Sequence, residues 1–142
     1  MIRGKIVMKT AKILFVISAL FAAVLFADAK TDGKPDIEFA QTVYDFGSIP
    51  EEGGPVSFKF RFTNTGDAPL VILSARASCG CTRPSYPKKP VKPGETGEIK
   101  VTYLPANRPG EFAKEVTVKT NISGKKKKIR LGISGVVIPE KK

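Results

Sequence analysis

Histidine and tryptophan are both absent from this 142-residue chain, which also has only two cysteines and two methionines. Without imidazole the commonest general base of hydrolases is missing, and no pair of carboxylates has a spacing typical of acid–base catalysis. Both methionines, Met1 and Met8, lie near the N-terminus, so the rest of the chain lacks thioether ligands as well. These absences favour a non-enzymatic protein, and they predict no catalytic residue and no cofactor.

The N-terminal segment has the pattern of a secretory signal peptide. Lys9 and Lys12 precede the apolar run Ile13–Phe26, and Ala27-Asp28-Ala29 follows it as a small-x-small cleavage site. The run is shorter than the roughly 20 apolar residues that a membrane-spanning helix needs. The sequence therefore predicts an exported protein, periplasmic or secreted from the cell, with no stable membrane span after cleavage.

Cleavage after Ala29 divides the chain into a signal peptide (1–29), a flexible leader (30–36) and one folded domain (37–139). The formal net charge is +11, of which the expected signal peptide carries +3, leaving +8 on the mature chain. A basic exported domain can meet acidic proteins, polysaccharide or lipid, or its charge can simply keep it soluble. Nucleic acid is not expected, because basic and aromatic residues interleave in no more than one strand. The expected partner is an unidentified protein or envelope component.

Alternating apolar and polar residues predict about seven short strands and no helix. The clearest strand is Val56–Thr63, in which Val56, Phe58, Phe60 and Phe62 alternate with polar residues and should enter the core. The other expected strand segments are Ile37–Phe39, Val43–Phe46, Leu70–Leu73, Ile99–Tyr103, Phe112–Val118 and Ile129–Val137.

Turn-forming residues separate these segments. We expect turns at Gly47 and Pro50–Pro55, at Asn64–Asp67, at Pro93-Gly94 and at Asn107–Gly110, whereas the prolines of Arg83–Lys92 predict an edge strand or a loop. Lys114 shares the parity of Phe112 and Val116, which predicts a bulge or an exposed strand end there. The pattern predicts an all-β fold, an antiparallel immunoglobulin-like β-sandwich without the disulfide that joins the two sheets of antibody domains.

Several short motifs resemble the bacterial domain of unknown function 1573. They are Tyr44-Asp45-Phe46-Gly47, Phe60–Gly66, Ser78-Cys79-Gly80-Cys81-Thr82, Val91–Glu95, Gly110-Glu111-Phe112 and Val118–Asn121. The resemblance covers roughly Ile37 to Val137. It implies an immunoglobulin-like sandwich, similar to domains of sperm-protein and cilia scaffolds and usually found on exported bacterial proteins. It implies no catalytic residues.

Cys79 and Cys81 are the only reactive pair in the chain, and three interpretations of them are open. They can be structural, either as small buried residues or as a disulfide across Gly80, which would close almost no loop and add little stability. Two thiolates at this spacing can also hold a soft ion such as Cu(I), although a four-ligand zinc site would need two more donors. The third interpretation is redox chemistry, in which Arg76 and Arg83 could favour the thiolate.

The sequence as a whole favours a non-enzymatic binding or scaffolding module of the cell envelope. The alternative is a thiol-based metal or redox protein that uses Cys79 and Cys81. Sandwiches of this class bind partners through loops at their ends or by pairing a free edge strand.

Overall fold

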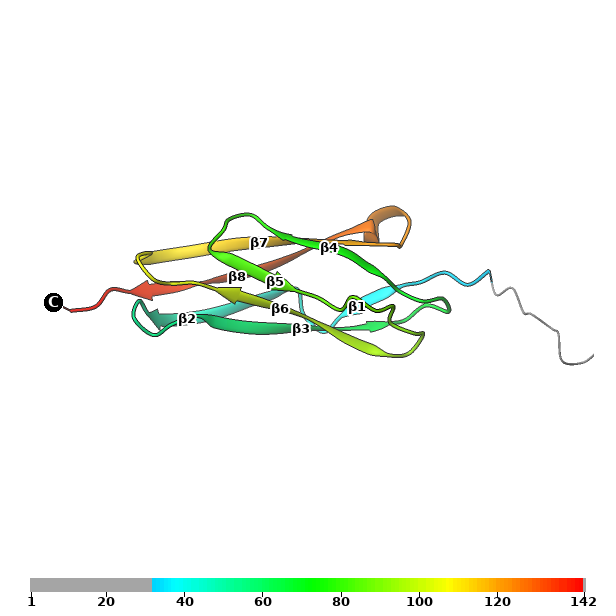
Figure 1. The fold of residues 1–142 in the computed structure, drawn as a ribbon, viewed down its shortest axis with the longest axis horizontal. Helices are drawn as coiled ribbons and strands as arrows, with labels where there is room; N and C mark the ends of the chain where they lie inside the picture. Colours follow the sequence, from blue (N-terminus) through cyan, green and yellow to red (C-terminus); the bar gives the residue numbers. More distant parts are fainter. Residues whose placement is uncertain (1–31, 142) are drawn as a thin grey trace, which may run out of the picture. The chain divides into compact units, whose positions relative to one another are not determined.

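The computed structural model describes residues 32–141, which fold into two four-stranded sheets packed face to face (Figure 1). The expected signal peptide lies outside the described residues. The first sheet has the strand order β1-β3-β6-β5, and the second has the order β2-β8-β7-β4. The strands are β1 (Ile37–Phe39), β2 (Val43–Pro50), β3 (Val56–Asn64), β4 (Ile72–Ala77), β5 (Thr82–Ser85), β6 (Thr96–Tyr103), β7 (Gly110–Thr120) and β8 (Lys128–Ile138).

The first sheet confirms the register that its sequence predicts. Strand β3 pairs antiparallel with β6, with Phe60 opposite Ile99 and Phe58 opposite Val101. Phe60 and Phe62 are fully buried, whereas Phe58 is half-buried and stacks on Tyr44 of β2 at a ring-centroid distance of 3.8 Å. At the edge, β5 contains Pro84 and pairs only with β6, which is where a strand can tolerate the missing donor.

The second sheet departs from a purely antiparallel sandwich, because β2 pairs in parallel with β8. Strand β1 ends at Phe39, and residues 40–42 carry the chain to the other sheet. Consecutive segments of the chain, β1 and β2, thus form an edge strand of each sheet. Strand β2 also runs through Gly47, where a turn was expected. Gly47 has φ 67°, a conformation that glycine adopts without strain, and the register shifts there as in a bulge.

Strand β7 is also more regular than the sequence predicts. It pairs with β8 without interruption from Gly110 to Lys119, so there is no bulge at Lys114. Lys114 lies between Phe112 and Val116 on the core-facing side of β7 and is half-buried. The neighbouring strand β4 ends at Ala77, opposite Val116, and therefore does not extend alongside Lys114.

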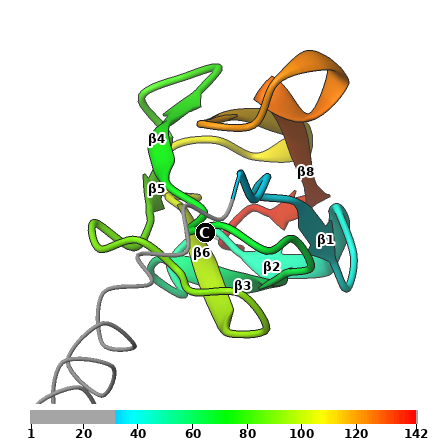
Figure 2. The ribbon, with the colours of Figure 1, turned by 90° about the vertical axis from the view of Figure 1, so that its right-hand side faces the viewer.

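Asn64 ties together the loops at the end of the domain that faces the viewer in Figure 2. Its side chain is fully buried and donates to the carbonyls of Ala68 and Val91 at 2.8 and 2.9 Å, while its Oδ1 accepts from the amide of Gly66 at 3.0 Å. The expected turn thus begins at the last residue of β3, whose side-chain amide joins two loops by hydrogen bonds. Gly66 is required here, because a Cβ at this position would collide with the backbone of Lys34.

An ion pair fastens the β7–β8 loop to the segment before β1. Lys126 Nζ lies 2.7 Å from Asp36 Oδ1 and is exposed, like the whole basic run 125–128. The hydrogen bond from Lys126, together with that from the amide of Ile37, lowers the pKa of Asp36. The contact therefore stabilises the fold above the ordinary carboxyl range and is lost as the solution is acidified through the lowered pKa.

Candidate functional site

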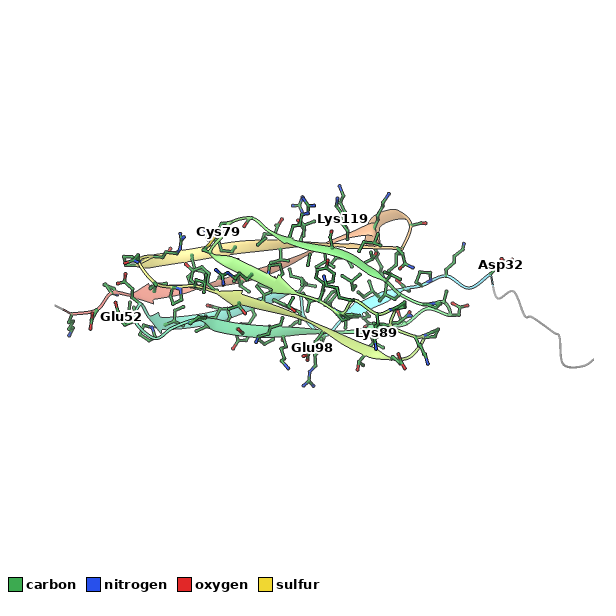
Figure 3. All side chains as sticks on the ribbon, in the orientation of Figure 1. Asp32, Glu52, Cys79, Lys89, Glu98 and Lys119 are labelled. Carbon is green, nitrogen blue, oxygen red and sulfur yellow. A yellow bond between two sulfur atoms is a disulfide. The ribbon has the colours of Figure 1, made fainter. Side chains whose placement is uncertain are left out.

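The Cys79-Gly80-Cys81 turn joins the two sheets at a corner of the sandwich. It follows β4 of the second sheet and leads into β5 of the first, where Figure 3 labels Cys79. The amide of Thr82 donates to the carbonyl of Cys79 at 3.3 Å, so the chain reverses over Gly80. This tight turn brings the two Cα atoms to 5.4 Å, inside the range that a disulfide needs.

The two cysteines differ in burial although their sulfurs are bonded to each other. Cys81 is 1% exposed and belongs to the core, whereas Cys79 is half-buried at its margin. The amide of Cys81 donates to the Sγ of Cys79 at 3.1 Å, and the hydroxyl of Thr82 lies 3.7 Å from the Sγ of Cys81. One sulfur therefore faces the margin of the domain and the other faces its interior.

Contacts from both sheets hold the turn in place. Ser78 is bonded to Glu115 of β7 in both directions, its amide donating at 2.9 Å and its Oγ accepting at 3.2 Å. On the other side the amide of Leu104 donates to the carbonyl of Cys81 at 2.9 Å. Nearby, Tyr103 stacks on Phe112 at 3.9 Å, and burial raises the pKa of the Tyr103 phenol.

A hollow of about 430 Å³ adjoins the turn on the outer face of the second sheet, and Ser78, Lys114 and Glu115 form part of its lining. A second hollow of about 580 Å³ continues along the same face and shares Ala113 and Ser134 with the first. Three small residues that point outward make these depressions. Ala113 and Ser134 are cross-strand partners, and Gly132 lies two residues before Ser134 on the same face of β8. We call this surface the hollow face.

The rim of the hollow face carries apolar and charged side chains. Val43 is 64% exposed beside Gly132, and Val136 lies at the far end. Asp45, Glu111 and Glu115 lie along the rim, and Arg130 contacts Glu115 at 3.5 Å. The hollow face of this strongly basic chain thus has three carboxylates against two cations, Lys114 and Arg130.

The outer face of the first sheet also has hollows, of about 460 Å³ beside Ser57 and about 340 Å³ beside Thr63, and it differs in its side chains. Its residues are polar and mostly long, and two of its cross-strand contacts are an ion pair between Lys59 and Glu98 at 2.8 Å and a hydroxyl pair between Ser57 and Thr102 at 2.8 Å. Figure 3 labels Glu98 on this side and Lys119 on the side of the second sheet. Such side chains satisfy one another and meet water.

The structure brings together the two residues that the sequence singled out, and it adds surroundings that the sequence did not predict. Neither the hollow face nor the position of Lys114 beside the turn was expected. The small outward residues of β7 and β8 could predict the hollow face, but only when the pairing of these two strands is already known. Arg76 and Arg83, expected beside the thiols, are exposed on β4 and β5.

Within residues 32–141 no three His, Cys, Asp or Glu side chains gather closely enough to hold a metal ion. The same part of the chain contains no helix with the length and hydrophobicity to cross a membrane.

Comparison with known proteins identifies the family. The chain matches the family described as protein of unknown function (DUF1573) over residues 37–137 and belongs to it. No match was found among curated proteins.

Solved structures with a similar fold come from unrelated settings. A protein of unknown function from Porphyromonas gingivalis W83 has a TM-score of 0.65 at 15% identity, over 80% of this chain and 51% of that one. The Vibrio cholerae VesB protease gives 0.57 at 18%, over 73% and 32%. The ASH/PapD-like domain of human CEP192 gives 0.54 at 17%, over 74% and 87%. This chain thus spans about half of the P. gingivalis protein and a third of the protease, and the likeness shows a PapD-like or immunoglobulin-like fold alone.

Proposed function

We propose that this protein is an exported, non-enzymatic module of the cell envelope that binds another protein through its hollow face. The observation that carries the proposal is the contrast between its two outer faces. Both faces have hollows, but the first sheet places an ion pair and a hydroxyl pair on its surface, whereas the hollow face has small residues at its centre and the 64% exposed Val43 at its rim. Small and apolar groups with a charged rim are the composition of a protein-binding surface.

The charges at the rim favour a polypeptide over an anionic polymer. Asp45, Glu111 and Glu115 outnumber the two cations of the same lining, Lys114 and Arg130, and so weaken the attraction of the basic chain for the phosphates or carboxylates of such a polymer. A protein surface with apolar groups at its centre and basic groups at its rim complements the hollow face.

The sheet edges support binding through a face rather than by strand addition. Strand β1 has only three residues, β5 contains Pro84, and β2 and β4 each have a register shift. Short strands, prolines and bulges are the devices by which proteins keep edge strands from pairing with other chains.

The test is a binding experiment with the mature protein immobilised and the envelope fraction of the native host as the probe. Ala113→Trp fills the hollow face, and Ser57→Trp places the same side chain in a hollow of about 460 Å³ on the outer face of the first sheet as the control. We expect at least one envelope protein to be retained by the wild type and by Ser57→Trp and to be reduced about tenfold or more by Ala113→Trp. If no retained protein distinguishes the two variants, the proposal is wrong.

Export itself gives a separate prediction. Because Ala27-Asp28-Ala29 follows the apolar run, the mature protein should begin at Lys30. Mass spectrometry of the protein purified from its native host should find this N-terminus in the envelope or the medium. Protein that retains the residues before Ala29 would contradict the cleavage.

A further inference from the structure

We propose that Cys79 and Cys81 form a reversible thiol–disulfide couple in which Cys79 exchanges with external thiols and Cys81 is the buried resolving thiol. This inference does not depend on the hollow face binding a protein. It rests on the difference in burial between the two sulfurs and on the groups around each of them.

Access decides which sulfur can be attacked. A thiolate attacks a disulfide sulfur along the line of the S–S bond, from the side opposite the leaving sulfur. Cys81 is 1% exposed and belongs to the core, whereas Cys79 is half-buried at its margin, so an external thiol reaches Cys79 more easily. Attack on Cys81 would require the reagent to enter the packed interior.

The exchange balances with two equivalents of an external thiol, such as glutathione or the dithiol of a reductase. The first thiolate forms a bond to the Sγ of Cys79, and the S–S bond breaks with its electron pair on the Sγ of Cys81, which takes up a proton. A second thiolate then attacks the external sulfur of the mixed disulfide and releases Cys79 as a thiolate. The external thiols are oxidised to a disulfide, and the protein pair gains two electrons.

Hydrogen-bond donors lie beside both sulfurs and can stabilise the negative charge that develops on them during the exchange. The amide of Cys81, which already donates to the Sγ of Cys79 at 3.1 Å, can stabilise a thiolate on that sulfur. The hydroxyl of Thr82 is 3.7 Å from the Sγ of Cys81 and can donate to the leaving sulfur.

Lys114 is the cation that the strand register places opposite Cys79. Because Ser78 is bonded to Glu115 in both directions, the next residues along the two chains are Cys79 and Lys114. Lys114 is on the core-facing side of β7 and half-buried. A lysine in this place favours a thiolate on Cys79, and we assign it a positioning role.

Two single variants test which sulfur reacts. Cys81→Ser leaves Cys79 as the one thiol of the mature chain, and Cys79→Ser leaves Cys81. With hydroxyethyl disulfide, a neutral reagent, the folded Cys81→Ser protein should form the mixed disulfide faster than Cys79→Ser by a factor on the order of ten or more. In denaturant the two rates should converge, because burial no longer separates the thiols. Equal rates in the folded state, or a faster Cys81, would overturn the proposal.

Reversibility is tested on the wild-type protein in glutathione redox buffers. The pair should be reduced and reoxidised while the amide NMR spectrum keeps the dispersion of a folded sandwich. Reduction that occurs only together with unfolding would overturn the proposal, because the bridge would then be purely structural.

The role of Lys114 has its own readout. In the Cys81→Ser background, Lys114→Gln should move the pH profile of the exchange rate toward higher pH, because the thiolate of Cys79 loses a nearby positive charge. Lys119→Gln, on the opposite face of the same strand, should leave the profile unchanged. An unchanged profile in Lys114→Gln would overturn the part assigned to that residue.

Discussion

Replacing Phe60 with alanine should lower the free energy of unfolding by about 3–5 kcal/mol. Phe60 is fully buried, lies opposite Ile99 in the first sheet and meets Phe58 edge-to-face at a centroid distance of 4.9 Å. Truncation removes a large apolar group from the middle of the core and leaves a cavity that two packed sheets cannot close easily. Urea denaturation, followed by far-ultraviolet circular dichroism, gives the measurement.

The adjacent residue supplies the control. Lys59 points to the opposite face of β3, is more than half exposed and pairs with Glu98 at 2.8 Å. Exposed ion pairs contribute little, so Lys59→Ala should change the stability by about half a kcal/mol or less. Equal losses in the two variants would mean that the assigned register of β3 is wrong.

Asn64→Ala should cost about 3 kcal/mol, although it removes only one small polar side chain. The carbonyl of Ala68 would lose its donor and the amide of Gly66 its acceptor, whereas the carbonyl of Val91 would keep only the amide of Leu70. Unsatisfied polar groups in a buried site keep their full desolvation cost, and water cannot reach a side chain that is 0% exposed. The loops that these bonds join should also become more mobile, which hydrogen exchange of residues 64–70 and 91–95 can measure.

Asn121 is the matched control for Asn64 at the same end of the domain. It makes the same kind of two-way contact, accepting from the amide of Val71 at 2.9 Å and donating to Pro69 at 3.1 Å, but it is exposed. Water can replace its bonds, so Asn121→Ala should cost about 1 kcal/mol. A loss in Asn64→Ala no larger than that in Asn121→Ala would contradict the role of Asn64 as a buried crosslink.

The parts of the fold that were predictable are those that local patterns determine. Strict alternation placed Phe60 and Phe62 in the core, and Gly94, with φ 79°, makes the expected turn after Pro93. Pairing between distant segments was not predictable in the same way. The parallel contact of β2 with β8 depends on where the chain crosses between sheets, which residues 40–42 do not encode locally.

For the candidate site, too, the residue types were predictable from the sequence and the long-range contacts were not. The two cysteines stood out because they are the only thiols in the chain, but their unequal burial follows from packing of the corner between β4 and β5. Asn64 looked like a turn residue because asparagine favours turns, and its buried bonds reach loops far along the chain. Lys114 interrupts the apolar alternation of β7, yet β7 pairs with β8 without a bulge. Because β4 ends at Ala77, opposite Val116, it does not cover Lys114, which stays half-buried.

The most direct test of protein binding through the hollow face is crosslinking inside the native host. A photo-crosslinking amino acid is placed at Ala113, at the centre of the hollow face, and in a matched strain at Ser57 on the first sheet. Irradiation should give a discrete adduct with one envelope protein from position 113 and none from position 57. Adducts of equal yield from both positions, or none from position 113, would contradict the account.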